Sequence, residues 1–475
     1  SNIRKAIDLK PNEWKAYLIL GSILKEHGKL EDAESNIRKA IDLKPNEGNS
    51  YLTLGIVLRE QGKIKEAEIY MRKSIEVDPA FSDAYFNLFR HYEEINKLEK
   101  LKEVLKEFSQ IEIIKNELLL FRSRLCYRNK EYELAKHLID NIDHEWLEIT
   151  SSYHRILYCS YKAFIEDKLS NYDLAYSYFE KSNKDPEYKY HQKECYLDYI
   201  RSYRQSISNI SLKRFNYVLE DPKVAFLIGF PRSGTTLLDT ILRSHSAIQV
   251  IEEKPIISNI ESVIKRDLNI KINDIFNIKE DDLTMLRRQY LESLGEYKNK
   301  EVKFIIDKLP LHTASLPLIN LLFPRAKIIF THRHPYDTVL SCFQQVFKPN
   351  IAMANLVSLE SSSQAYNQIM EAWDLYEKKL QLNSITSKYE DLIMNFDNHT
   401  LKILSFLGLD WDDNVRNFCK TALDRGQINT PSSSQVVQPI YKSSIGKWKN
   451  YNLYFEKCHE YLNKWVSYFN YEIIT

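Results

Sequence analysis

The sequence lacks the patterns on which several common kinds of protein depend. Its 6 cysteines include no C-x-x-C pair, and neither they nor the 12 histidines show the spacing of metal ligands. We therefore expect free thiols in a reducing, cytoplasmic compartment, and no metal site.

Long apolar runs and an excess of one charge are also missing. No window approaches about 18 uninterrupted apolar residues and the N-terminus has no signal-peptide pattern, so no membrane span is expected. The net charge of +1 predicts no nucleic-acid binding, and any anion site must be local. The chain begins at Ser1, inside a repeat, so we expect a fragment truncated at its N-terminus.

The first part of the chain repeats itself. Residues 35–47 repeat residues 1–13 one for one, which gives a period of 34 residues. Small residues at Gly21 and Ala33 allow two helices to cross closely, and Pro45 ends the second helix. The sequence therefore predicts antiparallel helical pairs.

This pattern resembles the tetratricopeptide (TPR) repeat, closely over residues 1–80 and in degenerate form beyond them. Each helical pair needs a neighbour to cover its apolar face, so we expect an α-helical TPR solenoid over residues 1–206. Such a surface binds a partner protein or acts as a rigid spacer. No cluster of charges or aromatic residues in the sequence separates the two interpretations.

A second stretch, residues 224–243, reads as strand, glycine loop and helix. The apolar run 224–228 predicts a buried strand, Gly229 and Gly234 bound a loop, and apolar residues recur at helical spacing after Thr235. Backbone N–H groups and the positive end of the helix dipole make such a junction a phosphate site. The glycines alone would also suit a plain packing junction.

The two glycines have the spacing of a P-loop, but the residues around them differ. A nucleotide triphosphatase has lysine directly after the second glycine, where this chain has Thr235. The cation of the loop is Arg232 instead. The loop therefore predicts an anion shorter than a triphosphate, held by Arg232, the backbone and the hydroxyls of Ser233, Thr235 and Thr236.

A second phosphate site is predicted further along the chain. A short strand at 327–330 leads to Arg333, Pro335 starts a helix, and Ser341 lies within that helix. Arg333 and Ser341 converge across this turn, and charge-assisted bonds from arginine favour phosphate. Two phosphate sites on neighbouring strands describe a nucleotide with both a 5′ and a 3′ phosphate.

Charged residues end two further predicted strands. Glu252 and Glu253 follow an apolar step at 248–251, and Lys308 ends the strand at 303–308. In an α/β sheet, ligands lie at the carboxyl ends of the strands. Neighbouring carboxylates raise each other's proton affinity, so this pair predicts a general base, and Lys308 a cation for a leaving group. A solvated acidic pair and an exposed loop lysine are the alternatives.

Two later segments complete the predicted site. Tyr389 follows a strand, where an adenine could stack on it. Residues 438–451 contain Ser444, Lys447 and Trp448, a composition that suits a flap over an anionic ligand or an ordinary loop packed on the tryptophan.

With these blocks in this order, residues 222–475 resemble the PAPS-dependent sulfotransferases. The motif P-R-S-G-T-T-L-L at 231–238, the pair Arg333 and Ser341, and the blocks D-K-L-P, Y-E-D-L, G-L-D-W and Q-P-I-Y-K-S-S-I-G-K-W all match. The closest branch is the tyrosylprotein-sulfotransferase-like one, with its bacterial members that carry N-terminal TPR repeats. The resemblance implies an α/β, P-loop-like domain with a central parallel sheet.

The resemblance also implies roles for individual residues. Arg232 and the backbone from Ser233 to Thr236 would hold the 5′-phosphosulfate of PAPS. Lys308 would steady the leaving oxygen, and Glu253 would be the catalytic base, with no metal required. Since the other branch of the family uses histidine as base in this general region, His312 is the alternative base.

The sequence leaves three functions open. The leading hypothesis is a PAPS-dependent sulfotransferase that acts on an acceptor hydroxyl, either protein tyrosine or a carbohydrate or small molecule. The second is a TPR adaptor with an inactive sulfotransferase fold, and the third is a P-loop kinase, which Thr235 disfavours. Pro255 stands where animal tyrosylprotein enzymes have an arginine for acidic peptides, so the acceptor is not assigned.

Overall fold

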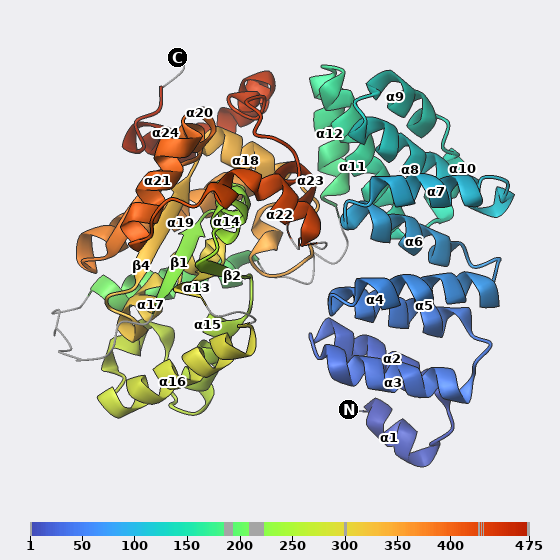
Figure 1. Cartoon of the computed structure of the whole chain (residues 1–475), viewed down its shortest axis with the longest axis horizontal. Helices are drawn as coiled ribbons and strands as arrows, with labels where there is room; N and C mark the ends of the chain where they lie inside the picture. Colours follow the sequence, from blue (N-terminus) through green and yellow to red (C-terminus); the bar gives the residue numbers. More distant parts are fainter. Residues whose placement is uncertain are drawn as a thin grey trace. The chain divides into compact units, whose positions relative to one another are not determined.

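The computed structural model describes residues 2–184, 193–208, 223–298, 302–425, 428, 430 and 432–472. By their contacts they form two compact units (Figure 1). The first is Ser1–Asn171 with Leu423–Ser434, and the second is Tyr172–Ala422 with Gln435–Thr475. Most of the linker predicted at residues 206–221 lies outside the described residues.

The first unit is a stack of helical pairs, as the TPR pattern predicts. A side-chain carbon added at Gly21 would lie 2.5 Å from Cγ1 of Ile37, and one added at Gly55 would lie 2.8 Å from Cγ of Met71. Glycine at these two equivalent positions therefore sets how closely the helices of a pair approach. The helices are α1 (Asn2–Leu9), α2 (Trp14–Glu26), α3 (Leu30–Leu43), α4 (Gly48–Glu60), α5 (Ile64–Val77), α6 (Ser82–Glu94), α7 (Leu98–Glu107), α8 (Lys115–Arg128), α9 (Tyr132–Asp140), α10 (His144–Ile149) and α11 (Ser152–Lys168).

Two helices that the sequence analysis grouped with the repeats pack in the second unit instead. They are α12 (Tyr172–Ser182) and α13 (Lys193–Ser208). Tyr199 and Tyr203 of α13 donate hydrogen bonds of 2.7 and 2.6 Å to Glu261 of α15 (Ile256–Arg266). The boundaries 1–206 and 222–475 therefore do not coincide with the units defined by packing, and the nature of α12 and α13 as degenerate repeats stays a prediction.

The second unit is built on a parallel sheet of five strands, in the order β2-β3-β1-β4-β5. The central parallel sheet expected from the sequence is thus confirmed. Parallel neighbours require crossover connections, and helices supply them here. The strands are β1 (Val224–Gly229), β2 (Ile248–Glu252), β3 (Phe304–Lys308), β4 (Lys327–His332) and β5 (Asn383–Lys388).

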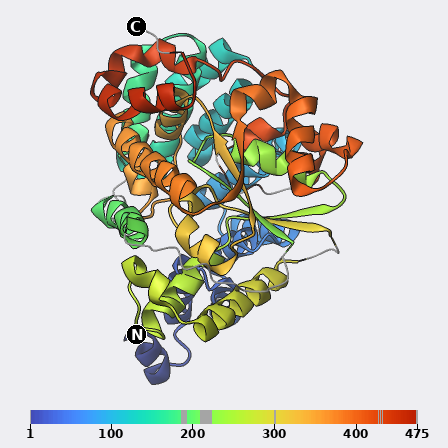
Figure 2. The same ribbon diagram turned by 90° about the vertical axis from the view of Figure 1, so that its left-hand side faces the viewer.

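Helices cover both faces of the sheet, because successive strand residues point to opposite sides. Ile329 of β4 packs in a cluster with α14 and α21, whereas the next residue, Phe330, stacks on Trp373 of α19 with ring centroids 3.8 Å apart. Figure 2 shows orange helices on either side of the green and yellow strands. The helices that follow α13 in the chain are α14 (Thr235–Arg243), α15 (Ile256–Arg266), α16 (Glu280–Glu296), α17 (Leu316–Leu322), α18 (Pro335–Phe343), α19 (Leu359–Lys379), α20 (Tyr389–Met394), α21 (Phe396–Leu407), α22 (Phe418–Asp424), α23 (Ser433–Val436) and α24 (His459–Tyr468). The residues of α22 and α23 are divided between the two units.

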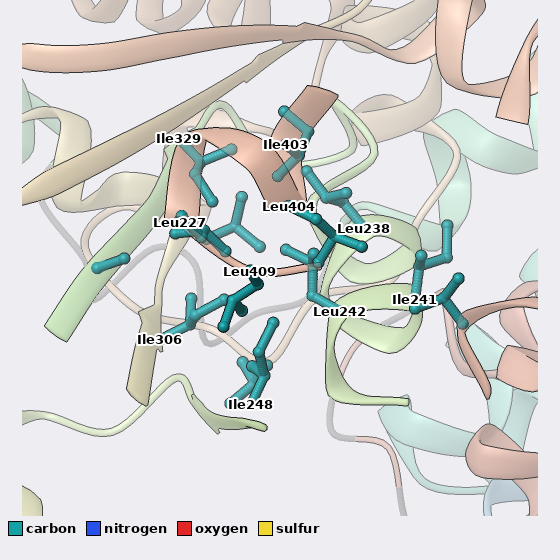
Figure 3. Packing of buried hydrophobic residues seen from close by; sticks show 14 of the residues in the cluster. Leu227, Leu238, Ile241, Leu242, Ile248, Ile306, Ile329, Ile403, Leu404 and Leu409 are labelled. Carbon is teal, nitrogen blue, oxygen red and sulfur yellow. The ribbon is translucent and has the colours of Figure 1, made fainter. Parts of the chain in front are cut away.

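The core of this unit holds the glycine loop in place (Figure 3). Leu227, just before the loop, and Leu238, just after it, are fully buried in one cluster with side chains of β3, β4 and α21. Burial of each such side chain contributes about 1.5–3 kcal/mol. Both ends of the loop are therefore anchored in the core. None of the described helices combines the length and apolar composition needed to cross a bilayer.

Candidate active site

The predicted site residues lie at one edge of the sheet. Because all five strands run parallel, their carboxyl ends meet at that edge. Lys308, the last residue of β3, is in register with Glu252 of β2 and with Leu227 of β1. The structure thus brings the loop after β1, the acidic pair after β2 and Lys308 to one place, as the sequence analysis expects.

The loop between β1 and α14 has room for glycine alone at both of its ends. A side-chain carbon at Gly229 would lie 2.5 Å from the carbonyl oxygen of Thr331. Gly234 has φ +101°, and a carbon there would lie 2.7 Å from Cδ2 of Tyr389. The chain therefore runs close under β4 and Tyr389 before α14 begins at Thr235, where the first backbone N–H groups of the helix remain for a ligand.

Arg232 links this loop to the second predicted phosphate site. Its Nε donates a hydrogen bond of 3.0 Å to Oγ of Ser341 on α18, and its Nη2 donates one of 2.9 Å to Oε1 of Gln435. Its backbone has φ +68°, which is unfavourable for a residue with a side chain. Ser233 lies beside it, with Oγ 2.8 Å from Oγ1 of Thr331. The hydroxyls of Thr235 and Thr236 are buried at the start of α14.

Arg333 follows β4 and is 7% exposed. Its guanidinium lies 5.0 Å from the centre of the Tyr389 ring, and its Nη2 donates to the carbonyl oxygen of Ser444. Its Nε has no hydrogen-bond partner among the described residues. A buried charged donor left without a protein acceptor is costly, so this N–H fits an anionic ligand at that position.

The segment predicted as a flap does lie at this edge. The backbone N–H groups of Gly446 and Trp448 donate to the two carboxylate oxygens of Asp337, at 2.7 and 3.0 Å. Oγ of Ser444 lies 2.9 Å from the hydroxyl of Tyr389, and Nζ of Lys447 donates to Oε1 of Gln344 at 3.0 Å. Asp337 of α18 therefore holds the backbone on both sides of Lys447, and Ser444 lies beside Arg333.

Lys308 is fully buried among carboxylates. Its Nζ donates hydrogen bonds of 2.8 Å to Oε1 of Glu252 and of 2.8 Å to Oε1 of Glu253, and it lies 3.9 Å from Oδ2 of Asp239. Burial of the ammonium lowers the pKa of Lys308, but the negative charges of Glu252, Glu253 and Asp239 raise it by more. The pKa of Lys308 is therefore raised overall. The lysine therefore stays a cation at neutral pH.

Glu253 is the more accessible of the two glutamates. Its side chain is 31% exposed, against 3% for Glu252. Partial burial raises the pKa of Glu253, Lys308 opposes the rise, and the charges of Glu252 and Asp239 add to it. A carboxylate with a raised pKa and access to solvent is a better proton acceptor than an ordinary glutamate.

The backbone of Glu253 has φ +51°, and its N–H donates to the carbonyl oxygen of Lys308 at 2.8 Å. This left-handed conformation turns the chain away from the sheet directly after β2. A residue with a side chain pays about 1 kcal/mol for it, and such strain concentrates at functional sites.

His312, the alternative base, lies apart from this group. It is 3% exposed, and its Nε2 lies 3.5 Å from Oδ1 of Asp307, which also accepts a hydrogen bond from Tyr290 through Oδ2. Asp307 and Lys308 are consecutive in β3, so their side chains point to opposite faces of the sheet. The structure therefore places His312 with Asp307, on the face away from the carboxylates of Lys308.

Three residues of the site were not predicted from the sequence: Asp239, Asp337 and Gln435, which contact Lys308, the flap and Arg232, respectively. Asp239 and Asp337 sit inside amphipathic helices, where an acidic residue gives no sign of a partner. Among the described residues, no group of three or more His, Cys, Asp or Glu could hold a metal ion.

Comparison with known proteins identifies two families in this chain. Residues 224–413 match the sulfotransferase family, and residues 15–47 and 48–81 match the tetratricopeptide repeat. Residues 224–413 are a sulfotransferase-family domain. The five strands and the residues at their carboxyl ends lie within this range, whereas Gln435 and the segment 444–448 lie beyond it. The resemblance stated from the sequence is confirmed.

Named relatives are similar to about half of the chain. The chain is 24% identical over 239 residues to protein-tyrosine sulfotransferase 1 of Danio rerio, covering 48% of this chain and 66% of that protein. It is 25% identical over 245 residues to the enzyme of the same name in Homo sapiens, covering 50% and 65%. An uncharacterised protein of Aquifex aeolicus is 30% identical over 256 residues, covering 50% of this chain and 32% of that protein.

The chain spans about a third to two thirds of the length of these relatives. Among solved structures, the sulfotransferase domain of the Synechococcus PCC 7002 olefin synthase is 19% identical, with a TM-score of 0.38, over 54% of this chain and 98% of that one.

Proposed function

We propose that this protein transfers a sulfuryl group from PAPS to an acceptor hydroxyl. The observation that carries the proposal is the placement of the half-buried Arg232 and the buried Arg333 at the glycine loop, across one sheet edge from Lys308 and Glu253. Two arginines and a helix start suit a nucleotide with two separate phosphates. The lysine and the accessible carboxylate suit proton and group transfer.

The proposed donor site has two halves. Arg232 and the backbone from Ser233 to Thr236 would hold the 5′-phosphosulfate. Arg333, through its unused Nε, and Ser341 would hold the 3′ phosphate, with Ser444 and Lys447 beside them. Tyr389 is the proposed neighbour of the adenine. The hydrogen bond from Arg232 to Ser341 joins the two halves, which supports one ligand that spans both.

The proposed reaction is an in-line displacement at sulfur. Glu253 takes the proton of the acceptor hydroxyl, and the acceptor oxygen forms a bond to sulfur. The bond from sulfur to the bridging phosphate oxygen breaks with its electron pair, and 3′,5′-ADP leaves. Lys308 stabilises the negative charge that develops on that bridging oxygen.

Protein tyrosine is the acceptor class that we propose, with a carbohydrate or small molecule as the alternative. The support is that the named relatives are protein-tyrosine sulfotransferases. The TPR repeats, which match a family known for protein contacts, would hold the acceptor protein or another partner. A cytoplasmic location, expected from the scattered cysteines, is part of the same proposal.

The test is to incubate the full chain with sulfur-labelled PAPS and a cell extract, and to separate protein from polysaccharide. We expect label in protein, recovered as tyrosine O-sulfate, and none with a Glu253→Ala variant that still binds 3′,5′-ADP within a few-fold. Label in polysaccharide would contradict the protein acceptor. Absence of both label and 3′,5′-ADP binding would favour the adaptor with an inactive sulfotransferase fold.

A further inference from the structure

A carboxylate within α14 faces Lys308 although it lies outside the predicted site. Asp239 is fully buried, and its Oδ2 lies 3.9 Å from Nζ of Lys308. It stands four residues after Thr235, so it lies on the same face of α14 as the end of the phosphate loop. Lys308 therefore has the two glutamates from the end of β2 and Asp239 from α14, the helix that follows the loop, as neighbours.

Asp239 is held firmly in this position. Its Oδ1 accepts from Nε of Arg243 at 2.9 Å, and Nη2 of Arg243 lies 2.8 Å from the same oxygen. Arg243 in turn donates to the carbonyl oxygen of Val250 on β2, at 2.7 Å. One oxygen of Asp239 is thus fixed by α14 and β2, and the other is turned to the lysine.

Three carboxylates and two cations make up this group. The carboxylates are Asp239 of α14, Glu252 of β2 and Glu253 directly after it, and the cations are Lys308 of β3 and Arg243 of α14. Burying a carboxylate costs several kcal/mol unless it is well paired. Arg243 already pairs with Oδ1 of Asp239, so the placement of Oδ2 towards a lysine that two glutamates already bond needs a reason.

The proposed reaction supplies that reason, and the inference rests on it. Only Oε1 of Glu253 accepts from Lys308, so Oε2 is the oxygen that takes the proton, while Lys308 turns from Glu253 towards the leaving oxygen. Glu252 alone would then hold the ammonium on the side away from the phosphate loop. We propose that Asp239 is a positioning residue, which holds the Lys308 ammonium on the phosphate-loop side when Lys308 leaves Glu253 for the donor nucleotide.

This role makes an unusual electrostatic prediction. Asp239→Asn removes a negative charge near an anion site, and by simple Coulomb attraction 3′,5′-ADP should then bind more tightly. If Asp239 acts by holding Lys308, the same substitution weakens binding, because the lysine stays with Glu252 and Glu253. The sign of the change therefore separates the two effects.

The test is a double-mutant cycle on the full chain, with 3′,5′-ADP binding measured by titration calorimetry. We expect Asp239→Asn to weaken binding about tenfold when Lys308 is present. In a Lys308→Gln background the same change should leave binding unchanged or tighten it. Binding that is unchanged or tighter in the wild-type background overturns the inference, and so does an equal loss in both backgrounds.

Two controls separate this role from a structural one. Asp307→Asn removes another fully buried carboxylate of β3, one that faces Tyr290 and His312, and should change 3′,5′-ADP affinity less than about twofold. The loss in Asp239→Asn should grow from pH 7 to pH 10, since Lys308 keeps Glu252, Glu253 and Arg243 as neighbours but loses the Asp239 charge that raises its pKa. A ratio that is constant with pH contradicts the inference.

Failure of the proposed function is recognised separately. A wild-type chain that does not bind 3′,5′-ADP at pH 7 refutes the donor assignment and this inference with it. A wild-type chain that binds, with an additive cycle, refutes only the role of Asp239. If Asp239→Asn does not fold, Asp239→Ser enters the same cycle, with the same two outcomes.

Discussion

Gly234 offers the sharpest test of the phosphate loop, because two costs can be separated there. The backbone has φ +101°, and an added methyl carbon would lie 2.7 Å from Cδ2 of Tyr389. A side chain in this conformation costs roughly 1–2 kcal/mol, and overpacking a fixed core adds roughly 1–3 kcal/mol. Gly234→Ala should therefore lower the free energy of unfolding by about 2–5 kcal/mol.

Gly62 provides a matched control within the same chain. It has φ +80°, but no atom lies within 4 Å of an added carbon. Gly62→Ala should therefore pay the backbone cost alone, roughly 1–2 kcal/mol. The difference between the two variants, measured by chemical denaturation, isolates the contact with Tyr389.

Gly234→Ala should also change the affinity of the proposed site for its ligand. To make room for the methyl group, Tyr389 must move, and its ring lies against Arg333 while its hydroxyl bonds Ser444. We expect Gly234→Ala to weaken 3′,5′-ADP binding at least tenfold, and Gly62→Ala to leave it unchanged. Equal destabilisation by the two variants, with equal affinity for 3′,5′-ADP, would refute the close packing of the loop under Tyr389.

Three further predictions concern single groups. Arg333→Lys loses a charge-assisted bond and the stack on Tyr389, so it should weaken 3′,5′-ADP binding roughly tenfold to a hundredfold in calorimetry. Binding of 5′-AMP, which has no 3′ phosphate, should not change. An equal loss for both nucleotides would contradict a 3′-phosphate site. The pKa of Glu253 is raised in the folded protein, so the charge on this residue lowers the stability of the fold at pH values above the unfolded pKa of 4.5. Glu253→Gln should therefore unfold at a higher temperature than the wild type at pH 7, and this gain should vanish towards pH 4. A gain that does not depend on pH would indicate an effect of packing. Burial lowers the pKa of His91 to about 4 from 6.5, so the first unit should lose stability as pH falls from 6.5 to 4, and His91→Leu should reduce that loss in thermal melts.

Much of the fold could be predicted because it depends on local patterns. The repeat of 34 residues and its small residues predict helical pairs, and the contacts at Gly21 and Gly55 show why glycine is needed there. The sheet and its functional edge follow from apolar runs that end in Gly229, Glu252 and Lys308. Parallel strands collect their carboxyl ends at one edge, whatever the order of the strands.

The remainder depends on contacts between distant segments. Nothing in the sequence around Tyr199 and Tyr203 distinguishes a repeat helix from one that packs on α15, because both have the same amphipathic period. In the sequence, Asp239 is an acidic residue within a helix like any other, and only the packing of α14 on the sheet brings it close to Lys308 of β3. The roles of Arg232, Glu253, Lys308 and Arg333 in binding and catalysis stay predictions.

The segment Leu423–Ser434 bears on how this chain can be divided. It packs with the repeats, yet the next residue, Gln435, bonds Arg232 in the phosphate loop. The backbone therefore passes between the two units after Asn171, after Ala422 and again after Ser434. A single cut cannot yield two independent modules, and an exchange of the repeats for those of another protein must also replace this short internal piece.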